Sequence, residues 1–329
     1  MWSGFAPYSS PKVSPTNPRI LPYGTAAIAE AAALIRAGEC VAVPTETVYG
    51  LAADATESRA VAGIYAAKGR PSFNPLIVHV PDLEAAERIA IFDERARDLA
   101  QRFWPGPLTL VLPVRPDAGI ASLVTAGLDT IAVRVPRHRA MQALLEASGR
   151  PLAAPSANAS GSISPTRAEH VAKSLAGRIP LVIDDGATPA GVESTIVMGD
   201  RILRPGPLSA EELFPGVESA SPDGPGPRLS PGNSHGITAP GQLDSHYAPS
   251  KPVRLNATEG RDGEYLIGFG AVAGAETLSV SGDLAEAAAN LFDALHRADA
   301  SAAPAIAVAP IPATGIGIAI NDRLRRAAF

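Results

Sequence analysis

The sequence predicts an α/β protein with two domains: a larger one built on a twisted, mixed sheet with helices, and a smaller one at the C-terminal end. Short apolar runs alternate with amphipathic segments from about residue 25 onward, as strands and helices do when they alternate. Several strand-like runs follow one another between residues 180 and 204, so a mixed sheet is expected rather than a purely parallel one. Residues 216–251 are dense in Gly, Pro and Ser and lack apolar periodicity, which is typical of a linker.

The larger domain is expected over residues 21–215, after a flexible tail of residues 1–20. Thr, Ser or Asp stands at the start of its first helical segments, where a side-chain oxygen can cap free backbone N–H groups. The predicted helices cover residues 25–37, about 56–68, 82–90, 93–104, 138–147 and the segment from 166. The predicted strands cover residues 40–43, 76–80, the end of 104–114, 130–135, 151–154, 180–184, 193–197 and 201–204.

The smaller domain is expected over residues 252–329 and has the same alternation. Its central helix is amphipathic, because apolar side chains recur there at helical spacing. The predicted strands cover residues 253–255, 265–269 and 305–309, and the predicted helices cover 283–298 and 320–328.

The composition excludes several classes of protein. A single cysteine among 329 residues, Cys40, rules out a disulfide framework or a cysteine-rich zinc module, and its apolar surroundings predict a buried core residue. The net charge of −5 argues against a surface built to grip nucleic acid. No run approaches the roughly 20 apolar residues of a membrane span, and the N-terminal segment lacks the order of a signal peptide. A cytoplasmic protein is therefore expected.

A polar turn is expected after the strand at residues 40–43. Pro44 cannot donate to a sheet ladder, so it should end that strand. Thr45, Thr47 and Tyr49 then place three hydroxyl groups on the turn. Ligands bind at the ends of strands in open α/β sheets, although Tyr49 could equally pack into the core.

Two cations, an amide and an imidazole follow at the ends of the next elements. Lys68 and Arg70 close the predicted helix, Asn74 comes after them, and His79 lies on the next strand. Cations at a helix end are also favoured by the helix dipole alone, and a histidine in a strand is usually a structural residue. For each of these residues taken singly, the structural explanation stays open.

Two further arginines and a serine-rich loop favour an anionic ligand. Arg134 and Arg204 lie on short apolar strands suited to burial, and a buried arginine needs an anionic partner. The loop at residues 156–164 precedes a helix and offers hydroxyl and N–H groups to phosphate, although it could be an ordinary turn. Taken with Lys68 and Arg70, these residues suit a polyanion such as a triphosphate.

The familiar nucleotide and metal motifs are missing from the chain. It contains no G-x-x-x-x-G-K-[ST] phosphate loop, no G-x-S-x-G nucleophile turn and no His/Asp/Glu cluster with metal-ligand spacing. Glycines between Gly268 and Gly274 approach a dinucleotide fingerprint, but the third is one residue late and a strand is expected next instead of a helix. No cofactor is assigned to that loop.

Several motifs occur in one order along the chain. They are PTETVYGL, KGRPSFNPLIVH, WPGPLT, APSANASGSISPT, ESTIV, LRPG and, in the linker, HYAPSKP. Together they resemble the long, two-domain form of the YrdC-like threonylcarbamoyl-AMP synthases from about residue 26 to residue 252, and more loosely through GIGIAINDRL. The resemblance implies a YrdC-like catalytic domain and a small Rossmann-like α/β domain. Because Tyr247 in the linker at 216–251 needs a packing partner, we expect the linker to fold over the active site as a lid that is ordered by ligand and braced by the C-terminal domain.

The resemblance also implies an activity. The expected enzyme is a nucleotidyltransferase that makes L-threonylcarbamoyl-AMP and pyrophosphate from L-threonine, bicarbonate or CO2, and ATP. Mg²⁺ would arrive with ATP and would need no protein ligand. The product would pass to downstream threonylcarbamoyl-transfer proteins that modify tRNA, without membrane association or stable nucleic-acid binding.

Residue roles follow from the resemblance alone. Lys68 and Arg70 are the expected catalytic residues, because they would neutralise charge while the carbamate of threonine attacks the α-phosphorus. The expected threonine-binding residues are Thr47, His79, Arg134 and Ser194. The expected ATP-binding residues are Lys68, Arg70, Asn74, Thr130, Ser156, Asn158, Ser164, Arg204 and, from the linker, Tyr247.

Two other functions fit the sequence less well. An RNA-binding module could use the same basic, concave site, but the acidic net charge disfavours it. A carbamoyl-transferring maturation enzyme shares the YrdC-like domain, but such enzymes carry cysteine-rich zinc modules and this chain has one cysteine.

Overall fold

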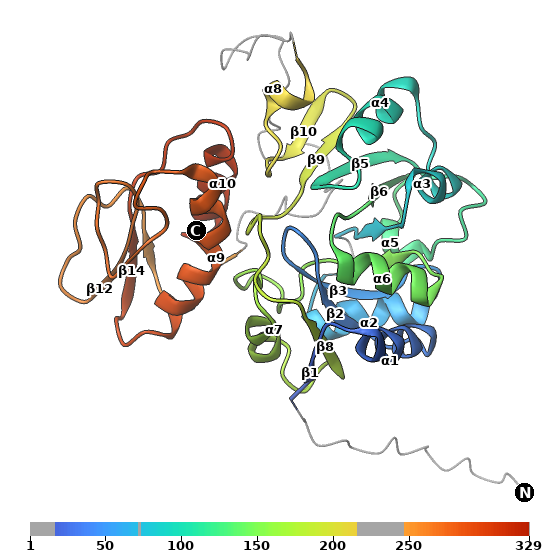
Figure 1. Cartoon of the computed structure of the whole chain (residues 1–329), viewed down its shortest axis with the longest axis horizontal. Coiled ribbons are helices and arrows are strands. Elements are labelled where there is room, and N and C mark those ends of the chain that lie inside the picture. Colours follow the sequence, from blue (N-terminus) through green and yellow to red (C-terminus); the bar gives the residue numbers. More distant parts are fainter. Residues whose placement is uncertain (1–16, 72–73, 216–246, 329) are drawn as a thin grey trace, which may run out of the picture.

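The computed structural model describes residues 17–71, 74–215 and 247–328, which form two α/β domains lying side by side (Figure 1). The predicted linker is outside the described residues except for its last part, from Tyr247 onward. None of the described helices is both long enough and apolar enough to cross a membrane.

The first domain contains short strands and helices in alternation. Its strands are β1 (Arg19–Pro22), β2 (Val41–Pro44), β3 (Tyr49–Asp54), β4 (Ile77–His79), β5 (Leu108–Pro113), β6 (Thr130–Arg134), β7 (Leu152–Ala153), β8 (Leu181–Asp184), β9 (Thr195–Met198) and β10 (Arg201–Arg204). Its helices are α1 (Thr25–Arg36), α2 (Ser58–Lys68), α3 (Leu83–Ile89), α4 (Glu94–Phe103), α5 (Ser122–Thr125), α6 (Arg139–Ser148), α7 (Ala168–Ser174) and α8 (Ala210–Leu213).

The strands of the first domain join into one ten-stranded sheet in the order β1-β8-β2-β3-β7-β4-β6-β5-β9-β10. The sheet contains both parallel pairs, such as β1–β8 and β4–β6, and antiparallel pairs, such as β2–β3 and β5–β6. The predicted mixed, twisted sheet is therefore confirmed.

Helices cover both faces of this sheet. On β2, Val41 and Val43 pack into a core cluster with α1 and α6, while Ala42 between them packs into the cluster that contains α2 and α3. This is the alternation that a strand imposes on successive side chains. Cys40 is buried beside the second cluster, as expected, and burial raises the pKa of its thiol to about 12.

The register of the central strands positions the site. The parallel pairing of β4 with β6 sets His79 beside Arg134, and both residues end their strands. On the β2–β3 hairpin, Pro44 ends β2 and pairs with Tyr49, so the polar turn is shorter than expected: it contains Thr45 and Thr47, whereas Tyr49 begins β3. The side chains that the sequence places at strand ends thus meet at one edge of the sheet.

The second domain contains β11 (Val253–Arg254), β12 (Glu264–Gly268), β13 (Glu276–Thr277), α9 (Leu284–Ala300), β14 (Ala305–Val308) and α10 (Gly317–Ala327). All pairs of its four-stranded sheet, in the order β11-β14-β12-β13, are parallel, and the predicted Rossmann-like α/β class is confirmed. In Figure 1, α9 and α10 lie between this sheet and the first domain.

The glycines after β12 have a packing explanation. A Cβ atom on Gly268 would lie 2.2 Å from the carbonyl oxygen of Val272, and one on Gly274 would lie 2.2 Å from that of Leu266. Only glycine allows the backbone to approach itself so closely. Because β13 follows instead of a helix, this loop lacks the helix N-terminus on which a dinucleotide fingerprint depends.

Close backbone contact and ion pairs join the two domains. Gly191 of the first domain has a φ of +68°, and a Cβ atom there would lie 2.2 Å from the carbonyl oxygen of Ala288 on α9. Nearby, the Arg167 guanidinium lies 3.0 Å from the Asp293 carboxylate. The helices of the second domain therefore rest directly on the backbone of the first.

Acidification is expected to weaken this interface. His296 stacks on His170 with ring centroids 3.8 Å apart, and burial, followed by the charge of His170, lowers the pKa of His296 to about 4. The unfolded chain binds this proton near pH 6.5 and the folded protein only near pH 4. Stability should therefore fall as the pH drops through that window, by at most about 1.4 kcal/mol per pH unit. The charged groups facing this pair are Arg167, Lys173, Asp293 and Arg297.

Thermal denaturation between pH 7 and pH 4 checks this expectation. His296→Asn keeps an amide that can bond to the Ser164 carbonyl oxygen, which lies 3.1 Å from the histidine ring. The variant should lose less stability than the wild type over the same pH range, and an equal loss in both proteins would contradict the prediction.

Several local expectations differ from the structure. The predicted tail ran through residue 20, but β1 begins at Arg19 and pairs with β8. The strand β3 was not predicted, and neither were the short helices α5 and α8, whereas the strand expected after Gly274 is present as β13. Asp82 and Asp93 cap their helices as expected, with hydrogen bonds of 2.7 Å, whereas α1 has Gly24 at its N-cap and α2 has Glu57.

Candidate active site

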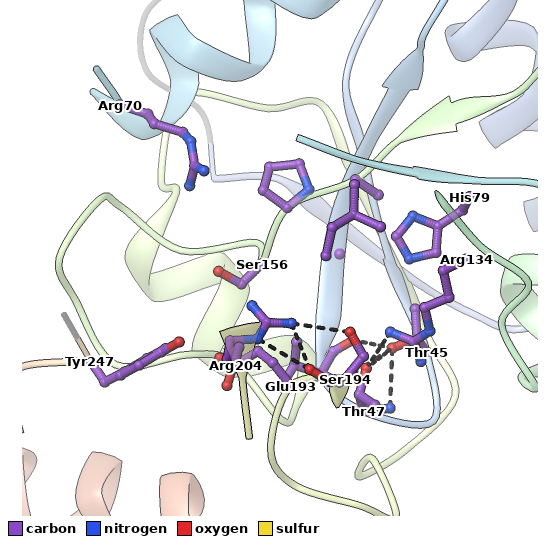
Figure 2. Close-up of a pocket in the computed structure, with 15 residues that line it drawn as sticks. Thr45, Thr47, Arg70, His79, Arg134, Ser156, Glu193, Ser194, Arg204 and Tyr247 are labelled. Atoms are coloured by element: carbon purple, nitrogen blue, oxygen red, sulfur yellow. Dashed lines mark hydrogen bonds between the residues drawn. The ribbon is translucent and has the colours of Figure 1, made fainter. Parts of the chain in front are cut away.

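A pocket opens where the ends of β4, β6 and β10 meet the β2–β3 turn and the serine-rich loop (Figure 2). The residues that line it are Thr45, Thr47, Val48, Gly50, Arg70, Ile77, His79, Arg134, Ala154, Pro155, Ser156, Glu193, Ser194, Arg204 and Tyr247. Most of the predicted site residues are among them. Figure 2 shows Thr47, His79 and Arg134 grouped toward one side and Arg70 and Tyr247 toward the other.

The β2–β3 turn is held by its own side chains. The hydroxyl oxygen of Thr45 accepts hydrogen bonds from the backbone N–H groups of Thr47, at 3.1 Å, and Val48, at 3.3 Å. It also lies 2.8 Å from the hydroxyl of Thr47. These bonds present the Thr47 hydroxyl to the pocket in one orientation. Tyr49 does not reach the pocket, because its hydroxyl donates to the Gly186 carbonyl at 2.8 Å.

Arg134 is buried and has three partners from two segments, the β2–β3 turn and the loop before β5. Its guanidinium donates to the Thr47 hydroxyl at 2.9 Å and to the Gly106 carbonyl at 3.2 Å, and it lies 2.8 Å from the Glu46 carboxylate. Burial alone would raise the pKa of Glu46, but the charge and hydrogen bond of Arg134 hold it below its ordinary value. The sequence predicted that Arg134 needs an anionic partner. The Glu46 carboxylate is such a partner within the chain, and its role was not predicted.

His79 is neutral at this edge of the pocket. Burial, followed by the charge of Arg134, lowers the pKa of its imidazole to about 3. Its Nδ1 atom makes no hydrogen bond to the described residues. His79 therefore provides an uncharged imidazole that can form a hydrogen bond on the Arg134 side of the pocket.

Three buried cations contact only neutral oxygens. Lys68 donates to the carbonyl oxygens of Ser156 and Asn158. Arg70 donates to the Pro75 carbonyl at 3.0 Å, and Arg204 donates to the carbonyl and hydroxyl oxygens of Ser194 at 3.0 Å. Within the described residues, none of the three forms an ion pair with a carboxylate.

Burial shifts all three cations toward their neutral forms. It holds the pKa of Lys68 well below its ordinary value, lowers that of Arg70 to about 10 and lowers that of Arg204. Buried charges without a counterion are costly to a folded protein. These buried groups would therefore be stabilised by an anionic ligand, because the described residues do not provide a carboxylate for them.

Lys68 does not line the pocket itself, and the remaining predicted residues also lie behind or away from the lining. The Asn158 amide donates to carbonyls of its own loop, and the Ser164 hydroxyl donates to Glu193 at 2.5 Å. Asn74 is buried with its Oδ1 atom unbonded among the described residues, while its carbonyl accepts from Arg70 at 3.3 Å. Thr130 begins β6 at the end opposite Arg134, paired with Pro113, so the structure does not bring it to this pocket.

Tyr247 comes from the last part of the predicted linker and closes one side of the pocket. It is buried, and its ring centroid lies 5.6 Å from that of Phe292 on α9. The next residue, Ala248, bridges to Ser162 in the serine-rich loop. Tyr247 thus contacts the second domain while it lines a pocket in the first.

The chain is similar to known proteins over nearly all of its length. A threonylcarbamoyl-AMP synthase from Bacillus subtilis (strain 168) is 43% identical over 92% of this chain and 92% of the relative. The chain belongs to the threonylcarbamoyl-AMP synthase family. Residues 33–206 match a family model described as "Telomere recombination", and residues 209–329 match one described as "Threonylcarbamoyl-AMP synthase, C-terminal domain".

Archaeal members of the threonylcarbamoyl-AMP synthase family are also close. The threonylcarbamoyl-AMP synthase of Pyrococcus abyssi is 41% identical over 90% of this chain and 92% of its own length. A crystal structure of P. abyssi Sua5 complexed with L-threonine superposes with a TM-score of 0.83 and 38% identity, covering 94% of this chain and 96% of that one. The two-domain architecture is thus shared with an experimental structure.

Two carboxylates in the site were missed by the sequence reasoning. Glu46 lies between the predicted hydroxyl residues Thr45 and Thr47, and Glu193 directly precedes the predicted Ser194. The signal for both was their place inside motifs already singled out. Their roles were hidden because each pairs with an arginine far away in the sequence.

Proposed function

We propose that this protein synthesises L-threonylcarbamoyl-AMP from L-threonine, bicarbonate or CO2, and ATP, with release of pyrophosphate. The observation that carries the proposal is the set of three buried cations, Lys68, Arg70 and Arg204, which have no carboxylate partner among the described residues. A triphosphate supplies the missing negative charge. The family membership supplies the identity of the reaction.

The Arg134 side of the pocket suits the amino acid. Arg134 and Glu46 together carry no net charge, which matches a zwitterion better than an anion. The guanidinium can bind the threonine carboxylate, and Thr47, Ser194 and the neutral His79 offer hydrogen bonds around it. The proposed threonine-binding residues remain Thr47, His79, Arg134 and Ser194.

The reaction itself needs little proton transfer from the protein. Once the threonine amine has become a carbamate, its oxygen attacks the α-phosphorus of ATP, and the bond from that phosphorus to pyrophosphate breaks. Arg70 and Arg204 lie where they can bind phosphate oxygens, and Lys68 fixes the serine-rich loop beside them. Positioning and charge neutralisation are the contributions expected from these residues.

Mg²⁺ fits this site through the nucleotide. No group of three or more His, Cys, Asp or Glu residues that could hold a metal occurs among the described residues. Glu193 lines the pocket, but its oxygens are bonded to Ser164 and Arg323. The ion would therefore be held by phosphate oxygens and water, where it would supply further neutralisation of charge.

Pyrophosphate release is expected to require threonine and bicarbonate together, because the carbamate must exist before it can attack. The test incubates the protein with ATP and Mg²⁺, adds each co-substrate alone or both, and measures pyrophosphate and threonylcarbamoyl-AMP. Serine in place of threonine should lower kcat/KM by about ten- to a hundredfold if the pocket fills around the threonine methyl group. Equal pyrophosphate release from ATP alone would contradict the proposal.

A further inference from the structure

One arginine of the second domain reaches the pocket from behind. Arg323 on α10 has no exposed surface, and its Nε atom donates to the Glu193 carboxylate at 2.9 Å. Its Nη1 atom donates to the Pro205 carbonyl at 2.7 Å, and both of these partners belong to the first domain. A single side chain thus connects α10 to two segments of the pocket wall.

The carboxylate that Arg323 binds is a buried anion inside a site that suits anions. Glu193 lines the pocket and accepts a hydrogen bond from the Ser164 hydroxyl through its other oxygen. Burial alone would raise the pKa of Glu193, but the charges of Arg323 and then Arg204 hold it below its ordinary value. Glu193 is therefore charged, and two arginines act on that charge.

Arg204 is the arginine that a phosphate ligand would need. It lines the pocket, donates to Ser194, the residue after Glu193, and forms no carboxylate ion pair within the described residues. Without Arg323, Arg204 would be the remaining arginine able to neutralise Glu193. A carboxylate and a phosphate would then compete for the same guanidinium.

We propose that Arg323 is a positioning residue for the nucleotide site: it binds Glu193 and thereby keeps Arg204 free for an anionic ligand. The proposal rests on the proposed function in taking that ligand to be the triphosphate of ATP. Arg323 also lies over the ring of Tyr247, with the guanidinium carbon 5.4 Å from the ring centroid, so it supports a second part of the same wall. The C-terminal domain in this way supports the nucleotide site, although Arg323 is not itself among the residues that line the pocket.

The test measures ATP binding by calorimetry without threonine or bicarbonate. Arg323→Gln should weaken ATP binding by about ten- to a hundredfold, the scale of one lost charge-assisted contact. Glu193→Gln should raise the affinity, because the competing anion is gone while the amide oxygen can still accept from Ser164. The double variant Glu193→Gln/Arg323→Gln should regain most of the loss. Arg325→Gln, an exposed arginine on the same helix, is the matched control for the change in net charge.

A merely structural role predicts that Arg323→Gln and Glu193→Gln both weaken ATP binding, because each breaks the same ion pair. The proposed role predicts opposite effects of the two changes on the affinity for ATP. If Glu193→Gln weakens ATP binding as much as Arg323→Gln does, or if Arg323→Gln binds ATP like the wild type, the inference is wrong. Should Arg323→Gln fail to fold, the double variant decides, since it buries no unpaired carboxylate at this position: wild-type affinity supports the inference and weak binding overturns it. Wild-type protein that does not bind ATP at all would contradict the proposed function and this inference with it.

Discussion

Lys68→Gln is expected to lower the affinity for ATP by at least about a hundredfold while the protein stays folded. Glutamine keeps an N–H donor for the carbonyl oxygens of Ser156 and Asn158 but removes the buried positive charge. Lys173→Gln, an exposed lysine on α7, is the control for the loss of one charge. A variant that binds ATP as tightly as the wild type would contradict the role given to Lys68.

The same lysine should make ATP binding depend on pH. Burial, followed by the charge of Arg70, holds the pKa of Lys68 well below its ordinary value in the free protein, and a bound triphosphate favours the charged form. Between the free and bound pKa values, binding must take up a proton, so affinity should fall as the pH rises through the lower of the two. Calorimetry in buffers of different ionisation enthalpy measures this uptake, and Lys68→Gln should abolish it.

Arg134→Ala is expected to abolish detectable threonine binding while ATP binding is largely kept. It should also destabilise the fold by about 3–5 kcal/mol, because Glu46 would be left buried without its partner. Calorimetric titration with each ligand and chemical denaturation check the two effects separately.

The double variant Glu46→Gln/Arg134→Ala separates the stability effect from the binding effect. Removing the stranded charge should restore most of the lost stability. Threonine binding should stay absent, since the guanidinium that binds the carboxylate is still missing. Recovery of threonine binding in the double variant would show that Arg134 acts only on stability.

Most of the fold was predictable because its signals are local. The alternation on β6 and the caps at Asp82 and Asp93 lie within a few residues of the elements that they define. The strand β3 was missed for the opposite reason, because YGLAAD is rich in Gly and Ala and has little strand propensity of its own. Its pairing with β2 and β7 is a property of the tertiary structure.

The site was predictable in its cations and hydroxyls and less so in its carboxylates. Arg70 and Arg204 stand at recognisable element ends, and the structure brings both to one pocket. Glu46 and Glu193 derive their roles from arginines in other parts of the chain, and no local pattern reveals such pairs. Thr130 was assigned through the resemblance alone, and its role as an ATP-binding residue stays a prediction.

The close approach of Gly191 to α9 limits which C-terminal domains can be joined to the first domain. Any side chain there would push α9 away from the first domain, and Phe292, on which Tyr247 packs, would move with α9. Replacing the C-terminal domain by an unrelated domain would therefore disturb the pocket in the first domain. A chimaera that takes this domain from a relative must inherit small residues opposite Gly191 and an arginine in place of Arg323, or one wall of the pocket will be rebuilt.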